Sequence, residues 1–81
     1  MISNQELEQK LSVMPEVTVA QVTGDLHHYY ITLVSDAFMG LSKLSRQKWV
    51  YAKLDTYIRS GALHAVHMKT FTTLEWETQH G

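Results

Sequence analysis

The order of strand and helix patterns predicts a single α+β domain, with its elements in the order α-β-β-α-β-α. Two runs at 16–23 and 28–35 are rich in valine, threonine or tyrosine, as β-strands are, and a third strand is expected at 63–70, directly after the helix-ending Gly61. Two segments at 4–13 and about 44–60 carry apolar residues at helical spacing. A chain of this pattern buries its apolar surface by stacking a sheet on helices. We therefore expect a three-stranded sheet with the helices packed on one face.

The N-terminal helix is expected over residues 4–13. Ser3 followed by Glu6 forms a capping-box pattern at its start, and Pro15 closes it. Its apolar residues recur at i, i+4 and i+7, which are Leu7, Leu11 and Met14. Together these signals predict one short amphipathic helix.

The first two strands are expected to form a hairpin. Gly24 and Asp25 interrupt the β-rich sequence, so the loop covers residues 24–27. Side chains alternate between the two faces of a strand, so one face of the second strand points to the core. The residues expected there are Tyr29, Ile31 and Leu33. The residues expected on the opposite face are His28, Tyr30 and Thr32.

The central helix is expected from about residue 44 to 60, after a loop at 36–42. Gly61 is expected at its C′ position, where a left-handed residue ends many helices. The residues expected to face the core are Leu44, Val50, Tyr51, Leu54, Tyr57 and Ile58. The residues expected on the solvent side are Arg46, Lys53 and Asp55.

The last part of the chain predicts a strand followed by a short helix. The strand covers 63–70, with His64 at its start. Thr72 and Glu75 form a second capping-box pattern, which begins the helix. The strand residues in phase with His64 that suit the core are Val66 and Met68, and those on the other face are Ala65, His67 and Lys69.

The composition limits the classes of protein to which the chain can belong. Its 81 residues make one domain, 1–81, and 44% of them are hydrophobic, as in globular proteins. No apolar run is long enough to cross a bilayer, and the N-terminus has no signal-peptide pattern. The chain has no cysteine, so disulfides are excluded and a cytoplasmic location is expected.

Charge is unevenly distributed, although the net charge is only −1. Residues 43–69 hold six basic side chains and one acidic one, whereas residues 1–42 hold one basic side chain and five acidic ones. A basic helix can contact phosphates and bind nucleic acid in a salt-dependent way. The residues that would do so are Lys43, Arg46, Lys48 and Lys53. The alternative interpretation is a solvated helix surface.

His64 is the residue most suited to bind a metal, because it follows Gly61 at the start of a strand, where a partner can reach it. His67 projects to the opposite face, so the two cannot hold one ion. Without cysteine, neither a closed zinc site nor an iron–sulfur cluster held by this chain alone is expected. Histidine can replace thiolate on one iron, so the chain can contribute one or two imidazoles to a shared cluster. The alternative is a surface or structural histidine.

Catalytic motifs are absent from the sequence. There is no Ser-His-Asp signature at a strand-to-helix turn, no glycine-rich phosphate loop and no pair of carboxylates placed for acid–base catalysis. The chain is therefore expected not to be an enzyme. A purely structural partner-binding module remains an alternative.

Several segments together resemble one family. Residues 24–29 (GDLHHY) are similar to its G-D-x-x-H-F turn, and residues 35–42 (SDAFMGLS) to its S-x-x-F-x-G-x-S loop. Residues 47–51 (QKWVY) stand where the family has a basic R-H-R-x-V-Y helix start. Residues 63–66 (LHAV) and 69–76 (KTFTTLEW) resemble its ending I-H-A-L…K-T-x-T-P-x-E-W, with Thr73 in place of proline. Over residues 5–77 the chain is identified as a member of the BolA family, most similar to the short bacterial IbaG (YrbA) branch.

The resemblance implies a KH-like α+β fold that lacks the GXXG loop of KH RNA binders, and this sequence contains no GXXG. It also implies a non-enzymatic adaptor that pairs with a monothiol, CGFS-type glutaredoxin. The pair would share a [2Fe-2S] cluster with glutathione and act in iron–sulfur trafficking or iron homeostasis. The family's C-terminal histidine corresponds to His64, and its loop histidine corresponds to His28, the candidate second ligand. The alternative is a DNA-binding transcriptional or stress regulator, which the replacement of R-H-R by residues 47–49 disfavours.

Overall fold

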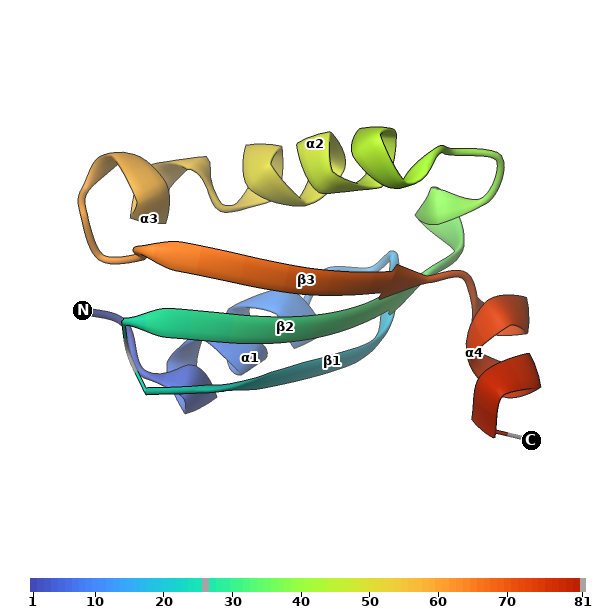
Figure 1. Ribbon diagram of the computed structural model, residues 1–81, viewed down its shortest axis with the longest axis horizontal. Helices are drawn as coiled ribbons and strands as arrows, with labels where there is room; N and C mark the ends of the chain where they lie inside the picture. Colours follow the sequence, from blue (N-terminus) through green and yellow to red (C-terminus); the bar gives the residue numbers. More distant parts are fainter. Residues whose placement is uncertain (26, 81) are drawn as a thin grey trace.

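The computed structural model describes residues 1–25 and 27–80, with the backbone alone at His80. The α+β prediction is confirmed, with one three-stranded sheet and its helices arranged as Figure 1 shows. The elements are α1 (Asn4–Ser12), β1 (Val17–Gly24), β2 (His28–Ser35), the 3-10 turn η1 (Asp36–Phe38), α2 (Lys43–Lys53), α3 (Asp55–Arg59), β3 (Ala65–Phe71) and α4 (Thr73–His80).

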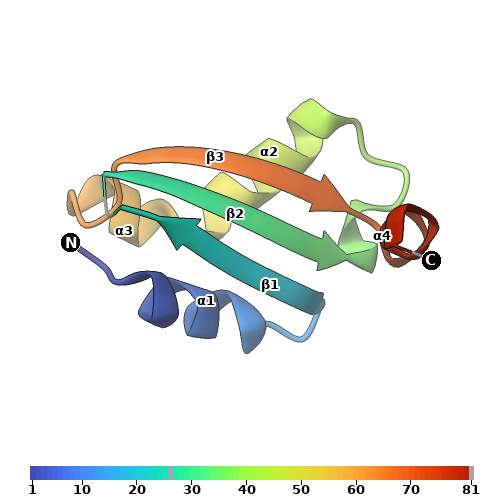
Figure 2. The same ribbon diagram turned by 60° about the horizontal axis from the view of Figure 1, so that its bottom comes forward.

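The sheet has the order β1-β2-β3, with β2 in the centre. The β1–β2 pair is antiparallel and forms the predicted hairpin, whereas β2 and β3 are parallel, as the connection through α2 and α3 requires. His28 pairs with Ala65 and Val34 pairs with Phe71, so β2 and β3 begin at one end of the sheet and finish at the other. Figure 2 shows these two strands running side by side in the same direction.

One hydrophobic core lies between the sheet and the first helices. Leu7 and Leu11 of α1 and Val50 of α2 share it with the inward residues of β2, which are Tyr29, Ile31 and Leu33. The predicted alternation is confirmed, because these three strand residues are buried whereas Tyr30 is 51% exposed. The outward face of β2 and β3 has no helix in front of it in Figure 1, except toward the carboxyl ends of the strands, beyond which α4 lies.

The predicted continuous helix over 44–60 is wrong, because the structure divides it at Leu54 into α2 and α3. Leu54 is buried and anchors the turn between the two helices. The buried side of α2 runs through Arg46, Val50 and Leu54, at intervals of four residues, so residues offset from this row by one or two positions are turned away. Three residues that were expected in the core are exposed. Leu44 and Tyr51 lie beside the buried row, and Ile58 follows the break at Leu54. Gly61 follows α3 with φ of +79°, as predicted.

Arg46 does not lie on the solvent side, which corrects the second expectation for this helix. The residue is only 7% exposed, and its Nε donates to the Leu41 carbonyl at 3.1 Å. Its two terminal nitrogens donate to the two carboxylate oxygens of Glu75 at 2.7 and 3.2 Å, and Nη1 also donates to the Thr70 carbonyl at 3.3 Å. Arg46 therefore ties α2 to the end of β3 and to α4.

Glu75 serves both this ion pair and the start of α4. The Thr72 hydroxyl accepts from the Glu75 N–H at 3.1 Å, and Glu75 Oε1 accepts from the Thr72 N–H at 2.8 Å, so the predicted capping box is confirmed. The Arg46 guanidinium, followed by the Thr72 N–H, lowers the pKa of the Glu75 carboxyl from 4.5 to about 2.

No helix in the described part of the chain has the length and apolar character that crossing a bilayer requires.

Candidate functional site

The loop that leads into β2 is held by backbone and side-chain hydrogen bonds. Gly24 has φ of +129°, and a Cβ atom at this position would collide with the His28 carbonyl oxygen, so glycine is required. Asp25 Oδ1 accepts from the N–H groups of His28 at 2.9 Å and His27 at 3.0 Å. These bonds lower the pKa of the Asp25 carboxyl. The Gly-Asp motif therefore fixes the backbone on which His27 and His28 stand.

The segment that leads into β3 is held just as firmly. Leu63, two residues after the left-handed Gly61, is buried, and its N–H donates to the Tyr57 carbonyl at 3.1 Å. On the other side of His64, the Ala65 N–H donates to the His27 carbonyl at 3.3 Å. The backbone of His64 is thus fixed between two anchored neighbours, while its side chain is exposed.

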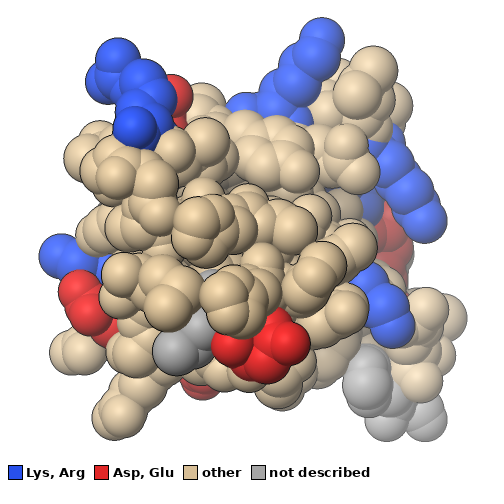
Figure 3. All heavy atoms as spheres, turned by 60° about the vertical axis from the view of Figure 1, so that its left-hand side comes forward, with Lys and Arg blue, Asp and Glu red and all other residues tan. Residues whose placement is uncertain are grey.

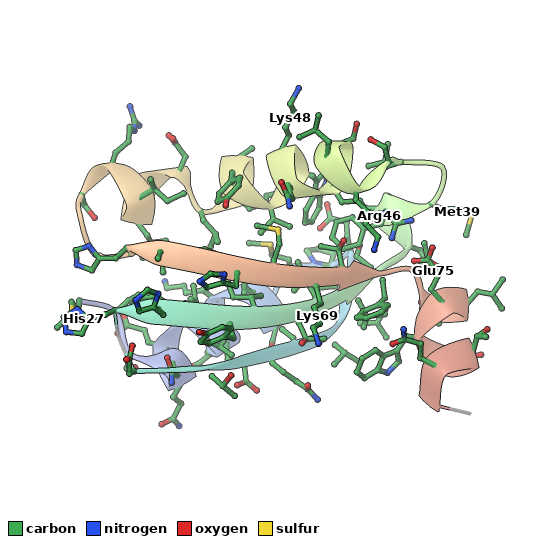
Figure 4. The ribbon with its side chains drawn as sticks, in the orientation of Figure 1. His27, Met39, Arg46, Lys48, Lys69 and Glu75 are labelled. Carbon is green, nitrogen blue, oxygen red and sulfur yellow. The ribbon has the colours of Figure 1, made fainter. Side chains whose placement is uncertain are left out.

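The two loops bring His27 and His64 together at the end of the sheet where β2 and β3 begin. Their ring centroids lie 6.3 Å apart with an interplanar angle of 31°, and both side chains are exposed. Figure 4 shows His27 at this end, projecting beyond the strands. We call the pair of His27 and His64 the histidine pair.

His28 lies elsewhere, on the outward face of the sheet. Its ring is stacked on that of His67, with 5.9 Å between centroids, and His67 is in turn stacked on Tyr30. The sequence-based pairing of His64 with His28 stays a prediction, but the residue that the structure places beside the His64 ring is His27.

Sequence reasoning missed His27, although a signal for it was present. A helix between two strands of one sheet indicates parallel pairing, and parallel strands begin at the same end. Since the first residues of the two strands, His28 and Ala65, are paired, the residues directly before them, His27 and His64, are neighbours. Finding them required the register between β2 and β3, which the sequence pattern alone did not define.

The histidine pair can supply only part of a metal site. Within the described residues, no group of three or more His, Cys, Asp or Glu side chains is placed to hold a metal ion. Figure 3 shows that most of the surface at this end carries neither Lys and Arg nor Asp and Glu side chains. Two exposed imidazoles on a largely uncharged end fit the role of co-ligands to a group whose other ligands come from a partner.

The basic residues proposed for nucleic-acid binding divide into two sets. Lys43, Lys48 and Lys53 are exposed, and Figure 4 shows Lys48 pointing away from the sheet. Lys53 Nζ lies 5.1 Å from the centroid of the Trp49 ring. Arg46 is buried against Glu75 and is not available to a phosphate.

Comparisons with known proteins agree with this fold. A protein-family model described as "BolA-like protein" matches residues 5–75. The chain is 32% identical over 75 residues to the "Acid stress protein IbaG" of Escherichia coli K12, covering 93% of this chain and 89% of the relative. It is 37% identical over 54 residues to the "DNA-binding transcriptional regulator BolA" of the same organism, covering 67% of this chain and 50% of that protein.

A solved structure of a BolA protein homologue from Coxiella burnetii superimposes on the chain with a TM-score of 0.82. The two are 29% identical, and the match covers 95% of this chain and 99% of the other. The family model and the structural match each cover most of the chain. This chain belongs to the BolA family.

Proposed function

We propose that this protein is a non-enzymatic adaptor that pairs with a monothiol, CGFS-type glutaredoxin and shares a [2Fe-2S] cluster with it through His64. The observation that carries the proposal is the histidine pair, exposed at one end of a rigid sheet. The chain has no thiolate of its own, so the remaining ligands must come from the glutaredoxin and glutathione.

His64 suits the role of ligand because its backbone is fixed while its ring is free to meet a partner. The Leu63 N–H and the Ala65 N–H are both bonded to neighbouring carbonyls, so the ligand position is defined before binding. Binding to iron requires the neutral imidazole, so assembly is expected to weaken in acid. Replacement of a thiolate by histidine also raises the reduction potential of a [2Fe-2S] cluster.

The second imidazole in this proposal is His27 in preference to His28. The His27 ring lies beside that of His64, whereas the His28 ring is stacked on His67 on the outward face. For His28 to join His64, its side chain would have to leave this stack and turn around the edge of the loop. His28 is retained as the alternative second ligand that the family resemblance implies.

Reconstitution of the heterodimer tests the proposal. The protein is mixed with a CGFS glutaredoxin, iron, sulfide and glutathione, and the cluster is followed by visible absorption and circular dichroism. His64→Ala is expected to abolish the spectrum of the heterodimer cluster, because it removes the ligand. His67→Ala is the matched control, since it removes an exposed imidazole three residues from His64, and is expected to leave the spectrum unchanged.

A wild-type spectrum from His64→Ala would reject the proposal. His27→Ala and His28→Ala, measured in the same way, identify the second ligand. We expect His27→Ala to alter the spectrum and His28→Ala to leave it as in the wild type. The opposite result would assign the companion position to His28.

A second candidate function is DNA binding through α2, which the name of one relative and the exposed lysines favour. Lys43, Lys48 and Lys53 are the residues concerned, without Arg46. If this function is present, binding to duplex DNA falls steeply with salt, and Lys48→Ala reduces the slope of that dependence by about one. Absence of binding at low salt would remove this candidate.

A further inference from the structure

Three rings stand in a row on the face of the sheet that the core does not use. The His67 ring lies 4.9 Å from that of Tyr30, at an interplanar angle of 14°, and 5.9 Å from that of His28, at 24°. The rings come from neighbouring strands, since Tyr30 pairs with His67 across β2 and β3. We call His28, His67 and Tyr30 the ring ladder.

The ring ladder is exposed, which distinguishes it from the aromatic residues of the core. Tyr30 is 51% exposed, whereas Tyr29, the next residue in the strand, is fully buried and donates its hydroxyl to the Ile2 carbonyl. One face of the Tyr30 ring is stacked on His67, and the half of the residue that is exposed remains available to a ligand.

A shallow hollow of about 560 Å³ borders Tyr30 and His67 at one end of the ladder. Its rim carries the Lys69 ammonium group, and Figure 4 shows that side chain extending from β3 across the outward face. None of the described residues around the hollow is acidic, and the polar ones besides Lys69 and the rings are Gln21, Thr23 and Thr32. The hollow therefore offers a ring to stack on, a cation and neutral hydrogen-bonding groups.

We propose that this outward face is a binding site for single-stranded nucleic acid. A base would stack on Tyr30, and the adjacent phosphate would be neutralised by Lys69. Histidine and tyrosine are among the residues on which unpaired bases stack in single-strand binders, and each stacked base contributes measurably to affinity.

This site is distinct from the exposed lysines of α2 and from the histidine pair. Lys48 points away from the sheet, whereas Lys69 crosses its outward face (Figure 4). The proposal does not depend on the shared cluster and is tested on the protein without iron.

The test is fluorescence anisotropy with a fluorescein-labelled oligothymidylate of twelve nucleotides at low salt. Tyr30→Ala is expected to weaken binding about tenfold, and Tyr30→Phe to retain the wild-type affinity because the ring is kept. Lys69→Ala is expected to reduce the slope of log affinity against log salt by about one. Tyr51→Ala and Lys10→Ala are matched controls, since they remove an exposed tyrosine from α2 and an exposed lysine from α1, and are expected to bind as the wild type.

Four results would overturn the proposal. One is an affinity of Tyr30→Ala equal to that of the wild type, and another is no binding of the oligonucleotide at low salt. The third is tighter binding to duplex DNA than to the single strand, with a loss on Lys48→Ala and none on Tyr30→Ala, which would move binding to α2. Sedimentation of the free protein shows whether the face instead joins two copies. Conversion of a wild-type dimer to a monomer by Tyr30→Ala would be the fourth result against the proposal.

Discussion

The two ends of the sheet carry chemically active side chains in opposite situations. At the closed end, where β2 and β3 finish, Arg46 and Glu75 are joined by two hydrogen bonds, and Arg46 satisfies two further carbonyls. At the open end, where the same strands begin, His27 and His64 lie side by side with exposed rings. The comparison shows that residue type does not define a binding site. A side chain is available to a partner only when the fold leaves its polar atoms unused.

Loss of the closed-end contacts is expected to have the largest effect on stability. Arg46→Ala removes the ion pair and leaves the Leu41 and Thr70 carbonyls without this donor, so the free energy of unfolding is expected to fall by about 3 kcal/mol. Urea unfolding followed by far-UV circular dichroism measures the change. Lys48→Ala, which removes an exposed cation from the same helix, is the control and is expected to stay within about 0.5 kcal/mol of the wild type. An equally small effect of Arg46→Ala would show that the two ends do not differ in the way proposed.

Protonation of Glu75 at the closed end is expected to lower the stability of the fold by less than Arg46→Ala does. The folded state holds the Glu75 pKa at about 2, below the ordinary value of 4.5, so the carboxylate stabilises the fold above about pH 4.5 and this contribution is lost as the pH falls toward 2. The difference in urea midpoint between wild type and Glu75→Gln is therefore expected to narrow between about pH 6 and pH 3. Glu77→Gln, an exposed glutamate two residues further along α4, is the control and should not alter the pH dependence. A constant difference across this range would contradict the assigned role of Glu75.

Much of the fold was predictable because its determinants are local. Strand alternation identified Tyr29, Ile31 and Leu33 as core residues, and the capping-box pattern located the start of α4. The break at Leu54 was missed because the apolar spacing of 44–60 fits one helix as well as two. Only the packing of Leu54 into the core distinguishes the two cases.

The candidate site was predictable only in part, for a similar reason. His64 stands at an element end that the sequence identifies, and the structure exposes it as expected. Arg46 resembled any other basic residue of a solvated helix, because its partner Glu75 is 29 residues away. His27 joins His64 through the pairing of two strands that are far apart in the sequence. The burial of Arg46 and the position of His27 beside His64 both depend on contacts between distant segments. A short sequence pattern does not encode such contacts.

The open end is expected to contribute least to stability, and this provides the sharpest contrast with Arg46. Neither imidazole of the histidine pair makes a hydrogen bond in the described part of the chain, and both rings are exposed. His27→Ala and His64→Ala are therefore each expected to change the free energy of unfolding by less than about 0.5 kcal/mol in urea titrations. A double variant should show the sum of the two single effects, because a ring contact at 6.3 Å between exposed groups has little coupling energy.

A loss above about 1 kcal/mol in either single variant would make the histidine pair a structural contact like the Arg46–Glu75 pair. The same variants are used in the reconstitution with glutaredoxin, so one set of proteins distinguishes a cluster ligand from a structural contact. A variant that folds with wild-type stability and fails to assemble the cluster has lost a ligand. A variant that fails to assemble the cluster because it is unfolded has lost a structural contact, and the two cases differ in their urea midpoints.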